Sequence, residues 1–289
     1  MSPANRLAVL PHGHVVDLVT GAPGDPWWKV STILDGAALT GFVSSAFLTP
    51  VDATPAPPLT PGSGRIAPVH LAEDSPSATR SVTTGRAFPI GEAGRPHRSS
   101  GPAAQRIAEQ IAIVRYLDVE RSTRYQPGGG STFCNIYAYD YCYLNNVYLP
   151  RVWWTSRAIA DLSAGVPVAV KYADTVNELN ANALYDWLRD FGPSFGWTRV
   201  ATLDEIQQAA NQGGVGVICA QRVDLNRSGH ITSVVPEDVP PLLAERSPAG
   251  IVKLPLQSQA GASNFCFSCG PGKWWAASKF RAFGFWTHA

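Results

Sequence analysis

A cysteine that follows a run of glycines could act as a nucleophile in this chain. Residues 128–130 are all glycine and lead into the apolar and aromatic segment 131–140, which contains Cys134 near its start. A helix is predicted to begin near Cys134, where free backbone N–H groups and the positive helix end favour a thiolate. A thiolate attacks carbonyl groups in acyl transfer, and the same N–H groups can hold the oxyanion that forms. Without a partner base, Cys134 would be an ordinary small residue in the first turn of a helix.

His230 is the candidate base. It follows Gly229 and precedes the apolar run 231–235, so we expect it at the start of a strand, where the sheet would hold its ring in place. A histidine on a strand is by itself more often structural. A cysteine followed well downstream by a histidine is, however, the order of the catalytic residues in papain-like hydrolases. The two contexts together predict a catalytic pair of Cys134 and His230.

Four further residues are candidates for the cleft or for substrate binding. Asn135 could donate a hydrogen bond towards an oxyanion, but beside a helix start it could equally be a local cap. Tyr125, before the glycine loop, could line the cleft, and Asn264 is a further cleft candidate. Asp140 could bind a substrate amine or anchor the helix, and we favour the structural interpretation.

The elements around these residues are predicted in the order helices, then strands. Apolar residues at helical spacing and Thr-x-x-Glu capping signatures predict helices over 103–117, over 176–188 with Thr175 as cap, and over 203–210 with Thr202 as cap. Apolar runs predict strands over 215–219, 231–235 and 250–254. Helices followed by consecutive strands indicate an α+β domain.

Three sequence segments, FCNIYAYD, GHITSVVP and SQAGASNF, together resemble the NlpC-type and related amidase domains. These are papain-like enzymes that cleave the stem peptides of bacterial cell wall, and the resemblance covers about residues 103–289. It implies a hydrolase in which the Cys134 thiolate attacks a peptide or amide carbonyl and His230 serves as base, through an acyl-enzyme. It implies no metal and no organic cofactor. Some antibacterial toxins that secretion machines carry between bacteria look similar.

A third residue would bind the far nitrogen of the His230 ring and fix its tautomer. Relatives place a second His, an Asn, a Glu or a Gln on the next strand. Gln259 ranks first by its place in SQAGASNF, since an amide oxygen can accept that hydrogen bond. Asn264 ranks second, and Glu237 third, because it should lie past the end of the strand as a solvated turn residue. The lack of a second His at this place departs from the commonest NlpC pattern.

The N-terminal residues 1–51 read as a small all-β domain. Short strands are predicted over 14–19, 27–30 and 37–43, and their close spacing with intervening turns suits a barrel. LPHGHVVDLV, PWWKV and GFVSSAFLTP resemble three landmarks of bacterial Src-homology-3-like (SH3b) domains, which bind cell-wall peptide or pack on the enzyme. Trp27 and Trp28 are the candidate binding residues. Because successive strand side chains face opposite ways, at least one of them should belong to the core.

Residues 52–102 are dominated by Pro, Ser, Thr, Ala and Gly, a composition that predicts a linker. His70 and His97, which lie within it, should then be solvated. We therefore expect three parts: an SH3-like domain over 1–51, a linker over 52–102, and a papain-like α+β catalytic domain over 103–289.

Composition excludes several other classes of protein. Of 289 residues, 45% are hydrophobic and the net charge is +1, so no basic surface would hold nucleic acid by charge alone. No run is long enough for a membrane span, and the N-terminus lacks a secretory signal. Action on the cell wall would thus need export by a signal-independent route, unless the protein works inside the cell or the chain has been shortened. The sequence identifies no immunity or delivery partner.

Five cysteines leave at least one thiol unpaired if the others form disulfides. Cys266 and Cys269 form a CxxC pair with no second pair nearby, which favours a local disulfide or two plain thiols over zinc. Two other functions stay open. One is an acyltransferase or transglutaminase-like enzyme that passes the acyl group to an amine. The other is a wall-binding protein with an inactive enzyme fold.

Overall fold

The computed structural model of this chain describes residues 8, 10, 16–20, 25–34, 37–48, 66–71, 78–238 and 242–289. The chain divides into two compact units, Met1–Pro55 and Ala56–Ala289. The predicted strand over 14–19 and the predicted linker over 52–102 lie partly outside the described residues. No helix within the described ranges is both long and apolar enough to cross a membrane.

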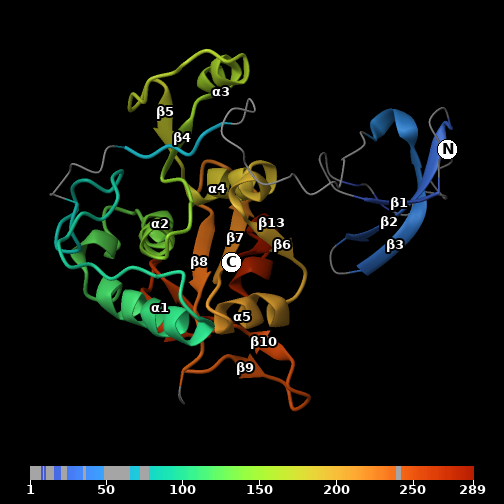
Figure 1. The fold of residues 1–289 in the computed structure, drawn as a ribbon. Helices are drawn as coiled ribbons and strands as arrows, with labels where there is room; N and C mark the ends of the chain where they lie inside the picture. The colour runs from blue at the N-terminus through green and yellow to red at the C-terminus, as the bar shows by residue number, and fades with distance from the viewer. Residues whose placement is uncertain are drawn as a thin grey trace. The chain divides into compact units, whose positions relative to one another are not determined.

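The N-terminal unit contains an antiparallel sheet in the order β1-β2-β3 (Figure 1). Its strands are β1 (Asp17–Thr20), β2 (Trp27–Leu34) and β3 (Ala37–Ser44), followed by the short 3-10 helix η2 (Ser45–Phe47). All three predicted strands are therefore found, with β2 longer than expected. The described residues form an open three-stranded sheet, however, and not the closed barrel that the sequence predicted.

The larger unit is a mixed α+β structure built on a six-stranded sheet in the order β12-β11-β8-β7-β13-β6, with every neighbouring pair antiparallel. The strands are β6 (Thr198–Val200), β7 (Val215–Arg222), β8 (His230–Val234), β11 (Gln257–Gln259), β12 (Phe265–Ser268) and β13 (Phe280–His288). β7 lies in the middle of the sheet and is buried along nearly its whole length. The predicted strands at 215–219 and 231–235 correspond to β7 and β8.

Helices cover both faces of this sheet. On one face, α1 (Ala103–Leu117), α2 (Cys134–Leu144) and α4 (Ala181–Asp190) share a core with Val217, Cys219 and Ile231. On the other, α5 (Leu203–Asn211) and the 3-10 helix η5 (Trp274–Ala276) pack on Ile218 and Ala220. Successive strand residues thus enter different cores, as the alternation of a strand requires. The first face is called the α2 face below, and the second the α5 face.

Two small hairpin-like pairs extend from opposite ends of the larger unit (Figure 1). At one end, β4 (Val152–Trp154) pairs with β5 (Val176–Glu178), and α3 (Ser156–Ser163) lies between them in the chain. At the other end, β9 (Glu245–Arg246) pairs with β10 (Val252–Leu254), which is the strand predicted at 250–254. Two further 3-10 helices are η3 (Thr123–Tyr125) and η4 (Gly192–Phe195).

The helix predictions are confirmed for α1, α2 and α5, and the start of α4 was predicted wrongly. Thr202 and Glu205 form the expected reciprocal capping box of α5. The helix predicted from 176 instead begins at Ala181, because the side chain of Asn180 caps it by accepting from the Ala183 N–H at 3.0 Å. The expected cap, Thr175, closes a turn by accepting from the Lys171 N–H at 2.8 Å.

The described part of the Pro- and Ser-rich segment belongs to the larger unit. This finding differs from the prediction of a linker over 52–102. Val69, Leu71 and Ile90 are buried in the core that contains α1 and α2. His70 packs among tyrosines, with Nδ1 3.3 Å from the hydroxyl of Tyr139. An irregular segment with few apolar residues can still bury those residues against the core of a neighbouring domain. The average composition of the segment does not reveal such burial.

Candidate active site

Cys134 is the first residue of α2, as the glycine-rich loop before it predicted. The N-cap residue Phe133 makes no side-chain cap hydrogen bond, so the first N–H groups of the helix are not occupied by a capping side chain. The thiol is 3% exposed. Burial raises its pKa, while hydrogen bonds from the backbone N–H groups of Ile231, Asn135 and Cys134 itself act in the opposite direction. The net shift is upward, so the resting side chain is a thiol.

The loop before Cys134 depends on its glycines. Gly128 and Ser131 close it with two backbone hydrogen bonds of 3.0 and 3.1 Å. Gly129 and Gly130 have φ values of +59° and +77°, a region that favours glycine. No atom lies within 4 Å of the position that a Cβ would take at either residue, so the space around them is open. Glycine is therefore favoured at these positions by the backbone conformation and not by lack of room.

His230 is the first residue of β8 and is joined to Gln259 of β11. The distance between His230 Nε2 and Gln259 Oε1 is 2.6 Å. The Gln259 amide nitrogen donates to the Ser263 carbonyl at 3.1 Å, which fixes the orientation of the amide and leaves Oε1 to face the ring. Nε2 of His230 must then carry the proton, and Nδ1 holds the lone pair. Nδ1 makes no hydrogen bond with any of the described residues.

The His230 ring is held neutral by its surroundings. Burial is the main cause that lowers its pKa to about 4, with Lys279 and Arg222 acting in the same direction and the Gln259 hydrogen bond acting against them. A neutral imidazole with a fixed Nε2–H tautomer can accept a proton at Nδ1 near neutral pH. The arrangement therefore suits a general base.

Trp274 of η5 covers the His230 ring, and sequence reasoning missed it. The two rings meet edge to face with centroids 4.6 Å apart. The Trp274 Nε1–H donates to Gln257 Oε1 at 3.0 Å, and the Thr232 hydroxyl donates to the same oxygen at 3.0 Å. Gln257 is fully buried, so it fixes the indole against the imidazole. No local signal in the sequence marked Trp274, which lies well downstream of both His230 and Gln259.

Cys134 and His230 lie at the same end of β8, on opposite faces of the sheet. The Ile231 N–H that binds the Cys134 sulfur belongs to the residue directly after His230. Ile231 faces α2, whereas the His230 ring lies against Trp274 of the α5 face. No hydrogen bond joins Sγ of Cys134 to the His230 ring among the described residues. The thiol therefore contacts the backbone of Ile231 and not the His230 ring. Proton transfer from Sγ to Nδ1 would require the two side chains to approach each other past the first residue of β8.

Asn135 and Asn264 both act as ties between segments near these residues. The Asn135 amide donates to the Leu179 carbonyl at 2.8 Å, which joins the start of α2 to the residue after β5. The Asn264 amide donates to the carbonyls of Val119 and Tyr125 at 2.9 and 3.1 Å, and its oxygen accepts from Gly261. Neither amide group points free into space, so both serve to position the loops around the candidate site.

Tyr125 and Asp140 lie in the interior. Asp140 forms an ion pair with Arg124 at 2.6 Å, and both side chains are 0% exposed. The Tyr125 hydroxyl donates to the same carboxylate at 2.9 Å. Asp140 therefore has no exposed oxygen for a substrate amine, in agreement with the structural interpretation, and the buried Tyr125 does not line an open cleft.

Glu237, expected to be a solvated turn residue, is held in place by several partners. Its carboxylate accepts hydrogen bonds from Arg246 at 2.5 and 2.6 Å, from Asn211 at 2.5 Å and from the Ala244 N–H at 2.7 Å. The Arg246 and Asn211 hydrogen bonds lower its pKa to about 2, although burial opposes this. Glu237 joins α5 to β9 and does not contact His230.

Trp27 and Trp28 lie on opposite faces of the N-terminal sheet. Trp27 is 44% exposed, and it shares its face with Phe42, which is 63% exposed. Trp28 is half-buried and lies on the face of the buried Val30. Trp27 is therefore the binding candidate of the two, and Trp28 contributes to the core of its unit.

All five cysteines are free thiols, so Cys266 and Cys269 do not form a disulfide. Both are partly exposed, on or beside β12. Within the described ranges, no group of three or more His, Cys, Asp or Glu side chains could hold a metal ion.

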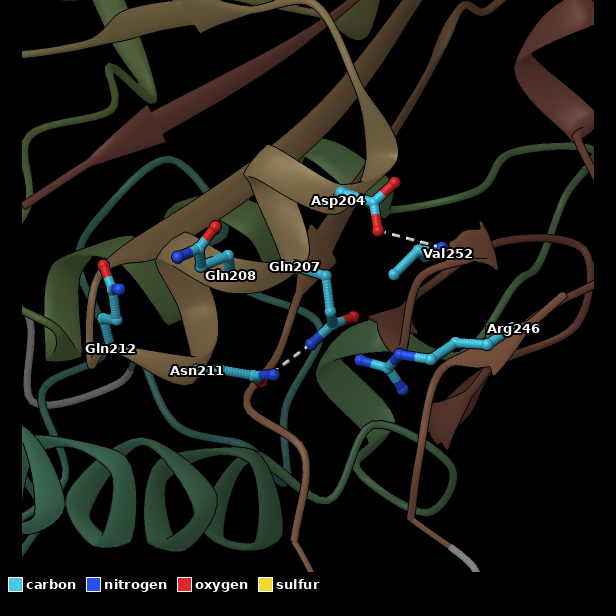
Figure 2. Close-up of a pocket in the computed structure, with 7 residues that line it drawn as sticks. All are labelled: Asp204, Gln207, Gln208, Asn211, Gln212, Arg246 and Val252. Atoms are coloured by element: carbon cyan, nitrogen blue, oxygen red, sulfur yellow. Dashed lines mark hydrogen bonds between the residues drawn. The ribbon is translucent and has the colours of Figure 1, made fainter. Parts of the chain in front are cut away.

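A shallow pocket of about 330 Å³ lies away from Cys134 and His230, between α5 and the β9–β10 pair (Figure 2). In the close-up, Gln207 and Asn211 are hydrogen-bonded to each other, at 3.0 Å, and Arg246 points towards them. Asp204 accepts from the Val252 N–H at 3.0 Å. The polar side chains are largely used to hold α5 to β10, and the pocket contains no nucleophile.

The chain was compared with protein-family models, curated proteins and solved structures. No protein-family model matches the chain, and neither a curated protein nor a solved structure matches it.

Proposed function

We propose that the larger unit is a papain-like cysteine hydrolase that cleaves amide or peptide bonds in the stem peptides of bacterial cell wall. The observation that carries this proposal is the His230–Gln259 hydrogen bond of 2.6 Å, with the amide oriented by Ser263. It leaves the lone pair of Nδ1 on a neutral ring. Cys134 lies beside the same end of β8, at the start of a helix with no side-chain cap.

The chemistry follows from the protonation states. Nδ1 of His230 takes the proton from the Cys134 thiol as sulfur attacks the substrate carbonyl carbon. The N–H groups at the start of α2 hold the oxyanion of the tetrahedral intermediate. His230 then gives its proton to the leaving amine, and the carbon–nitrogen bond breaks to leave a thioester on Cys134. A water molecule that loses its proton to His230 hydrolyses the thioester, which releases a carboxylate and restores the thiol.

Cell wall as the substrate rests on two supports. One is the resemblance of FCNIYAYD, GHITSVVP and SQAGASNF to the NlpC-type amidases. The other is the separate N-terminal sheet with its exposed Trp27 and Phe42, which suits a wall-binding module that resembles SH3b domains. The enzyme would then act in the periplasm or outside the cell.

The test is mass spectrometry of fragments released from purified peptidoglycan. We expect new peptide or amine termini from the wild type and from Cys269→Ala, which removes a partly exposed thiol just after β12. We expect none from Cys134→Ala. Release by Cys134→Ala would overturn the assignment of the nucleophile. Sacculus binding with no release by any of the three proteins would instead indicate a wall-binding protein with an inactive enzyme fold.

Hydrolysis in ¹⁸O-labelled water separates the hydrolase from an acyltransferase, because only hydrolysis places solvent oxygen in the new carboxylate. Transfer of the acyl group to an added amine with no label in the product would favour the acyltransferase.

A further inference from the structure

Three arginines lie close to one another near the start of α2, and in the described part of the chain only two of them have a carboxylate partner. Arg124 pairs with Asp140, and Arg151 pairs with Glu178. Both of these arginines are almost fully buried. Arg86 pairs with no described carboxylate, so the group carries one uncompensated positive charge.

Arg86 contacts the residue that precedes the nucleophile. Its guanidinium carbon lies 3.4 Å from the centroid of the Phe133 ring, in a cation–π contact. Phe133 is the N-cap of α2, and Cys134 is the next residue. The Arg86 carbonyl also accepts from Arg151 Nε at 2.9 Å, and Arg151 contributes to the electrostatic environment of Cys134. The position of Arg86 is thus fixed relative to the start of α2.

The guanidinium of Arg86 is only partly used. Nε donates to the Arg124 carbonyl at 2.8 Å, and Nη2 makes a long contact of 3.4 Å with the Thr123 carbonyl. Nη1 makes no hydrogen bond with any described residue, and the side chain is partly exposed. Burial lowers the pKa of Arg86, and Arg124 and Arg151 lower it further. A carboxylate from outside the chain would complete the group by forming charge-assisted hydrogen bonds.

We propose that Arg86 is a specificity residue that binds a free carboxylate of the substrate next to the scissile bond. The substrate class is then an acidic peptide, in which a carboxylate close to the cleaved carbonyl reaches the Phe133 end of α2. This inference rests on the proposed function. Arg86 contributes binding and orientation and takes no part in proton transfer.

The experiment uses soluble stem peptides released from purified peptidoglycan, in two forms. In one form the carboxylates are free, and in the other they are converted to primary amides by carbodiimide coupling with ammonia. The ratio of kcat/KM for the two forms is measured within each protein sample, so a reduced folded fraction in a variant cancels. Wild type, Arg86→Gln and Arg86→Lys are compared with Arg199→Gln. Arg199 is an exposed arginine of β6 with its guanidinium 5.6 Å from the Trp286 ring, so it is a matched control.

For the wild type and Arg199→Gln we expect roughly 10- to 100-fold faster cleavage of the free carboxylate form, the range of a lost charge-assisted hydrogen bond. Arg86→Gln should cleave the two forms at similar rates. Arg86→Lys should keep part of the preference, since it keeps the charge without the planar fork.

Equal cleavage of both forms by the wild type would overturn the role of Arg86 and leave the proposed hydrolase in place. A preference that persists in Arg86→Gln would overturn it as well. Failure of the wild type to cleave either form would instead overturn the proposed function.

Discussion

His230 and Gln259 are joined by a hydrogen bond of 2.6 Å between two antiparallel strands, β8 and β11. The bond determines which ring nitrogen carries the proton, because Ser263 holds the Gln259 amide in one orientation. It also leaves the ring without a charged partner, which is consistent with the lowering of the His230 pKa to about 4 by burial. In the proposed mechanism, an amide third residue gives a neutral pair, in which the Cys134 thiol passes its proton to the His230 imidazole as the sulfur attacks.

Gln259→Glu should shift the acid limb of the pH–rate profile upward. A carboxylate against Nε2 favours the imidazolium and should raise the His230 pKa by about one to three units. The profile of kcat/KM against pH measures this, with Gln208→Glu as control, because Gln208 is an exposed residue of α5. Gln259→Leu should lower kcat by roughly 100-fold, since the tautomer is no longer fixed. An unchanged acid limb in Gln259→Glu would show that His230 is not the base.

Trp274→Ala should raise the His230 pKa towards its ordinary value, because the indole is part of the cover that keeps water from the ring. We expect kcat to fall and KM to change little, since Trp274 acts through His230 and not through substrate. NMR titration of the His230 ring checks the pKa directly. Gln257→Leu, which removes the hydrogen-bond acceptor of the indole, should shift the same pKa in the same direction by a smaller amount. A lower kcat with an unshifted pKa in both variants would mean that Trp274 contacts substrate.

The sequence predicted the elements that local signals define. The glycine loop before Cys134 and the Thr202–Glu205 capping box are local, and α2 and α5 begin where these signals place them. Gln259, ranked first as the third residue, lies against His230, although its catalytic role stays a prediction. Trp274 could not be predicted, because η5 reaches His230 only after the chain has passed through β11 and β12.

The sequence also did not predict which polar residues, and which residues of the Pro- and Ser-rich segment, are buried. Asp140 could have been exposed or internal, and the contact with Arg124 that decides this comes from a different element. The segment over 78–102 looked like a linker because it has few apolar residues. Its structure depends on side chains such as Ile90, which is buried, and Arg98, which donates to the carbonyls of Asn145 and Gly213 at 2.9 and 2.6 Å.

The stability of the larger unit should rise with pH between about 4 and 6.5 through His230. Burial lowers the pKa of its ring from 6.5 to about 4 in the folded protein. Between these values the unfolded chain binds a proton that the folded protein does not, so the free energy of unfolding falls as pH falls. Above 6.5 and below 4 the contribution no longer changes.

Urea unfolding of wild type and His230→Gln across this pH range measures the effect. The difference between the two proteins isolates His230 from other titrating groups such as Glu237, whose lowered pKa acts mainly below 4.5. A difference in unfolding free energy that does not depend on pH would show that the His230 ring is well solvated and titrates normally.

Asp140→Ala should destabilise the larger unit by about 3–5 kcal/mol, because it leaves the Arg124 charge buried without a partner. It also removes the acceptor of the Tyr125 hydroxyl. Urea unfolding at neutral pH measures the loss, and kcat/KM is measured at a temperature where the variant stays folded. The exposed ion pair of Arg189 and Asp190 provides the control, since Asp190→Ala should cost about 1 kcal/mol or less. A stable Asp140→Ala with a selectively raised KM would instead return Asp140 to the substrate site, which its complete burial argues against.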